Sequence, residues 1–165
     1  MKFSTSREEL LKPIQFIIGA VERRQTMPIL SNLLLRNVDG NLVITATDLE
    51  LELSATLAVT VEGEDITVPG RKFLDICKSL SESSVINFST KGEKAELRAG
   101  KSRFSLATLA ATDFPLVDAL EIEDSVLVAK EDLLRLMEQT SFAMAQQDVR
   151  YYLNGLLFET QGAVL

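Results

Sequence analysis

The sequence contains no histidine and a single cysteine, Cys77. Without histidine the chain cannot use a Ser-His-Asp or Cys-His catalytic arrangement, a histidine general base or a histidine-ligated zinc ion. One cysteine cannot form an internal disulfide or a multi-cysteine metal site, which fits a reducing compartment. The sequence also has no glycine-rich phosphate loop. We therefore expect neither a cofactor nor a metal ion.

Long apolar stretches are missing as well. Residues 1–12 contain no apolar segment of the kind that a secretory signal needs, and charged residues interrupt every stretch long enough to cross a bilayer. The composition, with 46% apolar and 25% charged residues, is that of a soluble globular protein. We expect a cytoplasmic protein.

Positive charge is scarce and unevenly distributed. The 165 residues carry 17 Lys and Arg against 24 Asp and Glu, a net charge of −7. This balance argues against a simple electrostatic nucleic-acid binder, whose domain pI usually exceeds about 9. However, segments 7–24, 70–81 and 130–147 together hold nine basic and seven acidic residues, whereas the remainder holds eight basic and seventeen acidic residues. The net charge is thus +2 on these segments and −9 elsewhere.

Apolar residues recur with helical spacing in the same three segments, and each segment follows a short β-like run. Ser6 and Glu9 form a capping-box pattern, which predicts that the first helix begins at Arg7. Pro13 lies within that helix and is expected to bend its first turns. The β-like runs that precede the second and third helices are DITVP and SVLVA.

The first two helices are each followed by three runs with alternating apolar residues, separated by turn residues such as Asp39-Gly40, Gly92 and Gly100. The pattern predicts an α+β fold with duplicated β-α-β-β-β units and helices on one face of antiparallel sheets. We assign residues 1–118 to one domain, 119–124 to a connector and 125–165 to the start of a second domain. Because that third unit has only its helix and the β-like runs around it, we expect the chain to be a truncated piece.

An acidic run, Asp48-Leu-Glu50-Leu-Glu52, would place three carboxylates on one face of a strand. Such a cluster could hold a divalent ion for a nuclease or phosphatase, but an acidic, solvated face of a sheet is the interpretation that we favour. Cys77 lies on the apolar face of the second helix, so we predict a buried structural thiol and not a reactive one.

Two polar loops and one strand segment are candidate contact surfaces. Arg23-Arg24-Gln25 follows the first helix, and residues 146–152 follow the third helix and include the only tyrosines, Tyr151 and Tyr152. Such loops suit stacking on exposed bases and contact with phosphate. Alternatively, the tyrosines open a strand with one ring buried. Basic and apolar side chains are interleaved along residues 94–109. This segment is either an edge strand that can pair with another protein or an ordinary strand exposed to solvent.

Five segments resemble the bacterial β sliding clamp family, the DNA polymerase III β subunits. They are MPILSNLLL, TATDLELEL, VPGRKFLDICKSL, SRFSLATLAATDFP and the long TSFAMAQQDVRYYLNGLLFET. The resemblance extends from Met1 to about Thr160, somewhat under half of a full family member. It implies a non-catalytic processivity factor: three domains per subunit, and two subunits that close into a ring around duplex DNA, slide along it and tether the replicative polymerase.

The resemblance also implies DNA-binding residues. Those that match the family's DNA contacts are Arg24, Arg71, Gln147, Tyr151 and Tyr152, and Arg23 and Lys72 are neighbours of them. Gln147 and the two tyrosines match a loop that touches DNA, including a single-stranded overhang.

Two protein-binding surfaces are implied in the same way. Lys101, Arg103, Phe104 and Leu106 match the strand that meets the third domain of the opposite subunit in the homodimer. Arg150, Tyr152 and Leu153 match the rim of a groove that takes linear motifs of polymerases and the clamp loader.

A chain that lacks the rest of domain two and all of domain three is not expected to close a ring, so we expect a monomer, or weak association through exposed strand edges. An α+β protein-interaction module unrelated to DNA stays open as an alternative.

Overall fold

The structure is a computed structural model that describes residues 1–21, 27–117 and 125–160. The chain divides into two compact units, Met1–Asp118 and Ala119–Leu165, which are described separately. Among the described helices, none is both long enough and apolar enough to cross a membrane.

The first unit contains the β-α-β-β-β unit twice in full, which confirms the predicted fold class. The elements of the first repeat are β1 (Lys2–Ser6), α1 (Arg7–Ile17), β2 (Asn32–Val38), β3 (Asn41–Thr47) and β4 (Glu52–Leu57). The elements of the second repeat are β5 (Ile66–Pro69), α2 (Gly70–Ser79), β6 (Val85–Lys91), β7 (Lys94–Ala99) and β8 (Ser102–Ala107). The β2–β3 turn uses Asp39 and Gly40, both with positive φ, as the dipeptide predicts.

The two repeats exchange their first strands. The strand orders are β1-β6-β7-β8 in one sheet and β4-β3-β2-β5 in the other, and all neighbours are antiparallel. Strand β1 of the first repeat therefore pairs with β6 of the second, and β5 of the second repeat pairs with β2 of the first. As a result, neither repeat completes its sheet without the other.

Helix α1 begins where the capping box predicts. The Ser6 hydroxyl accepts a hydrogen bond from the Glu9 N–H at 3.2 Å, and the Glu9 carboxylate accepts one from the Ser6 N–H at 3.3 Å. The helix continues through Pro13 and ends at Ile17, where a 3₁₀ turn over Ile18–Ala20 follows. The α-helix is thus shorter than the apolar periodicity through residue 24 predicts.

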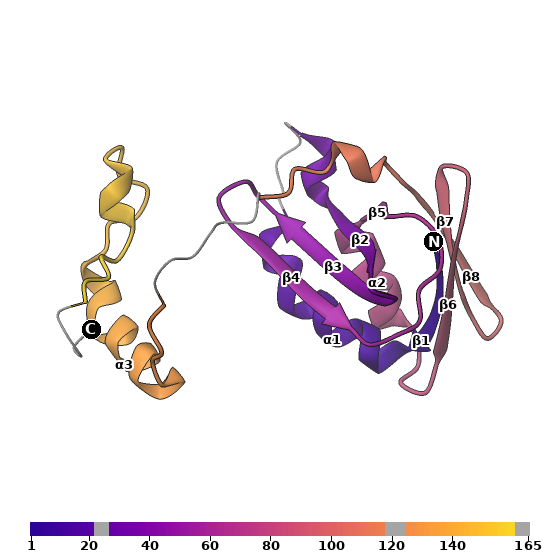
Figure 1. Ribbon diagram of the computed structural model, residues 1–165, viewed down its shortest axis with the longest axis horizontal. Coiled ribbons are helices and arrows are strands. Elements are labelled where there is room, and N and C mark those ends of the chain that lie inside the picture. The colour runs from indigo at the N-terminus through magenta and orange to yellow at the C-terminus, as the bar shows by residue number, and fades with distance from the viewer. Residues whose placement is uncertain (22–26, 118–124, 161–165) are drawn as a thin grey trace. The chain divides into compact units, whose positions relative to one another are not determined.

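The core of the first unit is formed by the apolar faces of α1 and α2 and the inner faces of both sheets. Figure 1 shows both helices on the same side of the β4-β3-β2-β5 sheet. Phe88 is the centre of an aromatic cluster: Phe3 stacks on it at 4.7 Å between ring centroids, and Phe73 of α2 meets it edge-on at 6.1 Å. The core therefore fixes both helices against the sheets, and their polar faces are left to solvent.

The second unit contains α3 (Lys130–Thr140), a 3₁₀ turn over Ser141–Ala143 and another over Tyr151–Asn154. The β-like run at 125–129 is not a strand in the structure, and the described residues 151–160 contain no strand either. A strand needs a neighbour to satisfy its backbone groups, and the described part of this unit offers none. No residue of α3 is fully buried, and its apolar face is only partly covered among the described residues, with Leu133 and Leu136 half-buried.

Candidate nucleic-acid interface

Basic side chains outnumber acidic side chains on the polar faces of α1 and α2. The basic residues are Arg7, Lys12, Arg71, Lys72 and Lys78, and the acidic residues are Glu8, Glu9 and Asp75. All of these side chains are exposed except Arg7, which is half-buried. The two helices thus present a mildly positive surface on a chain whose net charge is −7.

Arg71 is positioned by the glycine that precedes it. A Cβ atom on Gly70 would lie 3.1 Å from Leu33 Cγ and 3.2 Å from Val21 Cγ2, which is tighter than ordinary contact. Glycine therefore lets the first turn of α2 press against β2 and against the chain that leaves α1. Arg71 and Lys72 follow immediately and are exposed. The sequence pattern did not single out Gly70.

The predicted contacts Arg23 and Arg24 lie at residues 22–26, outside the described residues. In chain order they follow Val21, the residue that packs against Gly70.

Cys77 and Arg7 join the two helices. The Arg7 Nε donates a hydrogen bond to the Cys77 carbonyl oxygen at 3.0 Å. The Cys77 side chain is fully buried, and burial raises the pKa of its thiol to about 12 despite the nearby positive charge of Arg7. The thiol is therefore neutral at ordinary pH and has the structural role that the sequence predicts.

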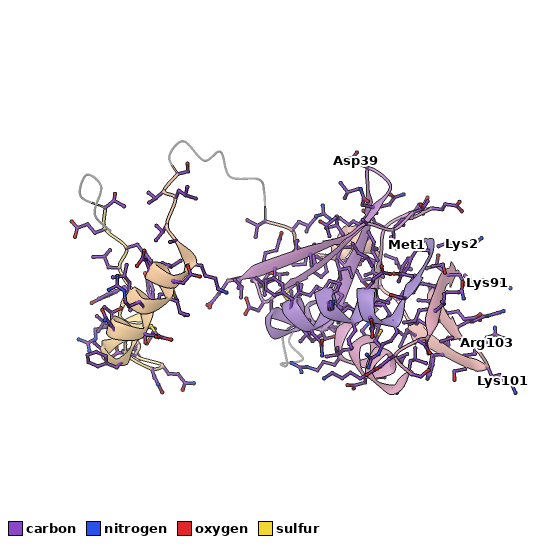
Figure 2. The ribbon with its side chains drawn as sticks, turned by 90° about the horizontal axis from the view of Figure 1, so that it is seen from below. Met1, Lys2, Asp39, Lys91, Lys101 and Arg103 are labelled. Atoms are coloured by element: carbon purple, nitrogen blue, oxygen red, sulfur yellow. The ribbon has the colours of Figure 1, made fainter. Side chains whose placement is uncertain are left out.

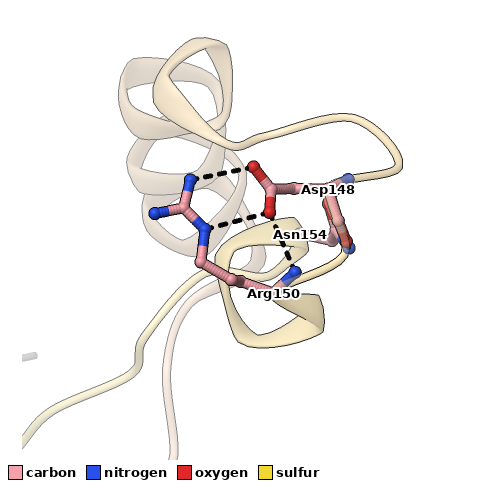
Figure 3. A network of polar contacts seen from close by, with 3 residues as sticks. All are labelled: Asp148, Arg150 and Asn154. Carbon is pink, nitrogen blue, oxygen red and sulfur yellow. Dashed lines mark hydrogen bonds and ion pairs between the residues drawn. The ribbon is translucent and has the colours of Figure 1, made fainter.

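In the second unit, residues 147–154 form a compact turn that we call the tyrosine loop (Figure 3). The Asp148 carboxylate accepts hydrogen bonds from the Arg150 N–H at 2.8 Å and from the Arg150 guanidinium at 3.1 and 3.0 Å. The Asn154 side chain bonds both backbone groups of Asp148, accepting from its N–H at 2.9 Å and donating to its carbonyl at 3.0 Å. Neither Asp148 nor Asn154 was singled out from the sequence, although a short Asx side chain beside a polar turn is a known signal.

The tyrosine loop exposes its aromatic rings. Tyr151 is 83% exposed and Tyr152 is 69% exposed, and the rings meet edge-to-face with centroids 6.2 Å apart. The alternative in which the tyrosines open a strand with one ring buried is therefore wrong. Gln147 is exposed and has a left-handed φ of 59°. The three expected groove residues, Arg150, Tyr152 and Leu153, are all exposed.

The loop is nearly neutral in charge. The hydrogen bonds from Arg150 lower the pKa of the Asp148 carboxyl, and the same contact raises the pKa of Arg150. The pair therefore stays ionised over the physiological range, and its charges compensate each other.

Strand β8 is an edge of its sheet among the described residues, and the expected subunit contacts lie on it or on the turn before it. Lys101 and Arg103 are exposed at this end of the first unit (Figure 2), and Phe104 is half-buried. The Arg103 Nε donates to Glu96 at 2.7 Å. The Leu106 side chain is only 5% exposed and belongs to the core, so β8 offers a partner only its main chain at that position.

The acidic run does not form a single face. Asp48 precedes β4, and its carboxylate accepts hydrogen bonds from the N–H groups of Glu50 and Leu51 at 3.1 and 2.8 Å. Leu49 adopts a φ of 79°, so the chain turns here and only Glu52 belongs to the strand. Among the described residues, no group of three acidic, histidine or cysteine side chains could hold a metal ion. The metal-dependent nuclease hypothesis therefore has no site in this part of the chain.

Comparison with protein-family models gives two matches. A model described as "DNA polymerase III beta subunit, N-terminal domain" matches residues 1–118, and one described as "DNA polymerase III beta subunit, central domain" matches residues 127–165. The chain belongs to the DNA polymerase III beta subunit family.

Curated relatives and solved structures of this family are similar along nearly the whole chain. The beta sliding clamps of Vibrio cholerae and Escherichia coli K12 are each 50% identical over 100% of this chain and 46% of their own length. A crystal structure of the Pseudomonas aeruginosa DNA polymerase sliding clamp superimposes with a TM-score of 0.90 at 47% identity, covering 98% of this chain and 44% of that one. Caulobacter crescentus pol III beta gives a TM-score of 0.88 at 35% identity, covering 94% and 42%. The chain thus spans just under half the length of the curated relatives that it matches.

Proposed function

We propose that this chain is the N-terminal part of a sliding clamp, a non-catalytic DNA polymerase processivity factor of the cytoplasm. In this proposal the parent protein forms a ring-shaped homodimer around duplex DNA, slides along it and tethers DNA polymerase III. Other polymerases and the clamp loader are its further partners. The observation that carries the proposal is the match of both family models to consecutive parts of the chain.

The charge distribution supports a sliding function. Strong neutralisation of many phosphates gives tight, salt-sensitive binding, which would hinder movement. A ring holds DNA by its topology and needs only a mildly positive lining, which the polar faces of α1 and α2 would supply. The acidic remainder of the chain would discourage other contacts with DNA and keep the protein soluble. In this proposal Arg24, Arg71 and Lys72 face the DNA backbone, and the tyrosine loop meets an unpaired strand.

The subunit interface and the groove are part of the same proposal. Lys101, Arg103 and Phe104, with the main chain of β8, would meet the opposite subunit. Arg150, Tyr152 and Leu153 would form one rim of the groove for polymerase motifs. Because the chain spans under half of its relatives, we expect it to be a monomer by itself.

The experiment that tests the proposed function uses the full-length parent protein loaded on circular DNA. We expect retention on closed circles and rapid loss when a restriction enzyme linearises them, because only a topological link is released by a free end. Equal retention on circular and linear DNA would contradict a clamp and favour direct binding. Light scattering on a sizing column tests the expected monomer of the 165-residue chain, and a stable closed dimer would contradict it.

A further inference from the structure

One side chain, that of Asn154, bonds across the tyrosine loop. Asn154 uses both ends of its amide on the backbone of one residue: Oδ1 accepts from the Asp148 N–H and Nδ2 donates to the Asp148 carbonyl. The two bonds connect positions six residues apart and resemble a main-chain pairing. Backbone bonds from Ala145 N–H to the Leu153 carbonyl, at 2.9 Å, and from Leu153 N–H to the Arg150 carbonyl, at 2.9 Å, complete the closure.

Asp148 organises the interior of the same loop. Its carboxylate accepts the Arg150 N–H and also holds the Arg150 guanidinium through both oxygens, as the dashed lines in Figure 3 show. The Asp148 and Asn154 side chains are half-buried, whereas Gln147, Tyr151 and Tyr152 around them are exposed. Polar bonds rather than apolar burial therefore define the shape of this loop.

Tyr151 and Tyr152 thus present exposed rings on a loop whose backbone is held by polar bonds. An unpaired nucleic-acid base has an apolar face that stacks on a tyrosine ring, and stacking is sequence-tolerant because every base has such a face. A loop that is already ordered loses less conformational freedom when the base arrives.

From these contacts we propose that Asp148 and Asn154 are positioning residues that hold the tyrosine loop in its base-binding shape before DNA arrives. The inference rests on the proposed function and deepens it. Asn154, together with the Ala145–Leu153 backbone bond, holds the two ends of the loop against each other, and Asp148 holds the turn between them and neutralises Arg150. Neither side chain needs to touch the nucleic acid.

The chain provides its own probe for a test. It contains no tryptophan and only two tyrosines, so its intrinsic tyrosine fluorescence arises entirely from Tyr151 and Tyr152. Titration of the 165-residue chain with a single-stranded oligothymidylate is expected to quench this emission as bases stack on the rings. Asn154→Ala should raise the oligothymidylate concentration at half-quenching by about 5- to 150-fold, the range that loss of one stacked base corresponds to.

A second readout distinguishes positioning from general stability. Without any DNA, Asn154→Ala should lower the fluorescence anisotropy of the tyrosines, because the rings gain freedom of motion. Asp148→Asn keeps an acceptor for the Arg150 N–H but loses the charge pair, so we expect a smaller change in the same direction. Gln139→Ala removes an exposed amide of α3 in the same unit and serves as the matched control, with no expected change.

The outcomes separate this inference from the proposed function. An Asn154→Ala chain with the anisotropy and half-quenching concentration of the unchanged chain would overturn the inference. Absence of quenching in the unchanged chain would also overturn it. In either case retention of the parent on circular DNA still decides the clamp function independently.

Discussion

Thr67 and Leu109 exchange two hydrogen bonds although they lie 42 positions apart in the chain. The Thr67 hydroxyl donates to the Leu109 carbonyl at 2.9 Å and accepts from the Leu109 N–H at 3.1 Å. It also accepts from the Asn32 side-chain amide at 2.9 Å. A hydroxyl has one donor and two acceptor positions, so this buried group is fully used. Through it, the segment that follows β8 in one sheet is tied to β5 and β2 in the other.

Thr67→Val should therefore destabilise the first unit. Valine keeps the shape of the side chain but leaves the Asn32 amide and the Leu109 N–H without their acceptor. A buried donor without a partner costs about 1–3 kcal/mol, so we expect the free energy of unfolding to fall by about 2–3 kcal/mol in urea denaturation. Thr67→Ser keeps the hydroxyl and should cost less. A Thr67→Val variant that is as stable as the unchanged chain would show that these hydrogen bonds do not contribute to stability.

The start of α1 provides a second test. Ser6→Ala removes the capping hydrogen bond to the Glu9 N–H and should lower the free energy of unfolding by about 1 kcal/mol. The hydrogen bond from Ser6 lowers the pKa of Glu9 below its ordinary value of 4.5. The stabilisation by this hydrogen bond is therefore fully present above pH 4.5 and is lost as the pH falls through the lowered pKa of Glu9. Denaturation curves at several pH values should show this loss in the unchanged chain and not in Glu9→Gln.

Features set by neighbouring residues could be predicted from the sequence. The capping box fixed the start of α1, the Asp39-Gly40 dipeptide fixed a hairpin, and the repeated apolar pattern indicated the duplicated units. The capping box and the hairpin turn each depend on residues within a few positions of one another. The duplicated units are indicated because the same apolar pattern occurs twice. The exchange of first strands between the two sheets was not predictable, because it depends on which distant strands find each other.

The errors also have physical causes. Alternation around Asp48 suggested a strand, but a short carboxylate that can cap its own turn competes with strand pairing, and the turn prevailed. The β-like runs of the second unit have the composition of strands but no partner among the described residues. In the tyrosine loop the sequence indicated the rings, since Tyr151 and Tyr152 are conspicuous. It did not indicate Asn154, whose role depends on the closure of the loop.

Cys77 gives a prediction about alkaline pH. Because burial raises the pKa of the thiol from 9.0 to about 12, the folded state resists ionisation while the unfolded chain does not. The associated stability is fully present below about pH 9 and should fall as the pH rises toward 12. Thermal denaturation from about pH 8 to about pH 11 should show this decline, and Cys77→Ala should remove most of it. A thiol reagent that labels the native chain as fast as the unfolded one would contradict the buried thiol.

Arg71 tests how the proposed clamp holds DNA. The side chain is exposed and makes no ion pair with the described residues, so Arg71→Ala should change the free energy of unfolding by less than about 0.5 kcal/mol. If Arg71 contacts one phosphate in the full-length parent, the slope of log K against log salt should become shallower by about 0.9. Fluorescence anisotropy of labelled duplex DNA at several salt concentrations measures that slope. As a control, Lys2→Ala removes an exposed charge from β1, away from the helices, and should leave the slope of log K against log salt unchanged. An equal effect of both variants would mean that Arg71 acts through overall charge and does not contact the DNA backbone.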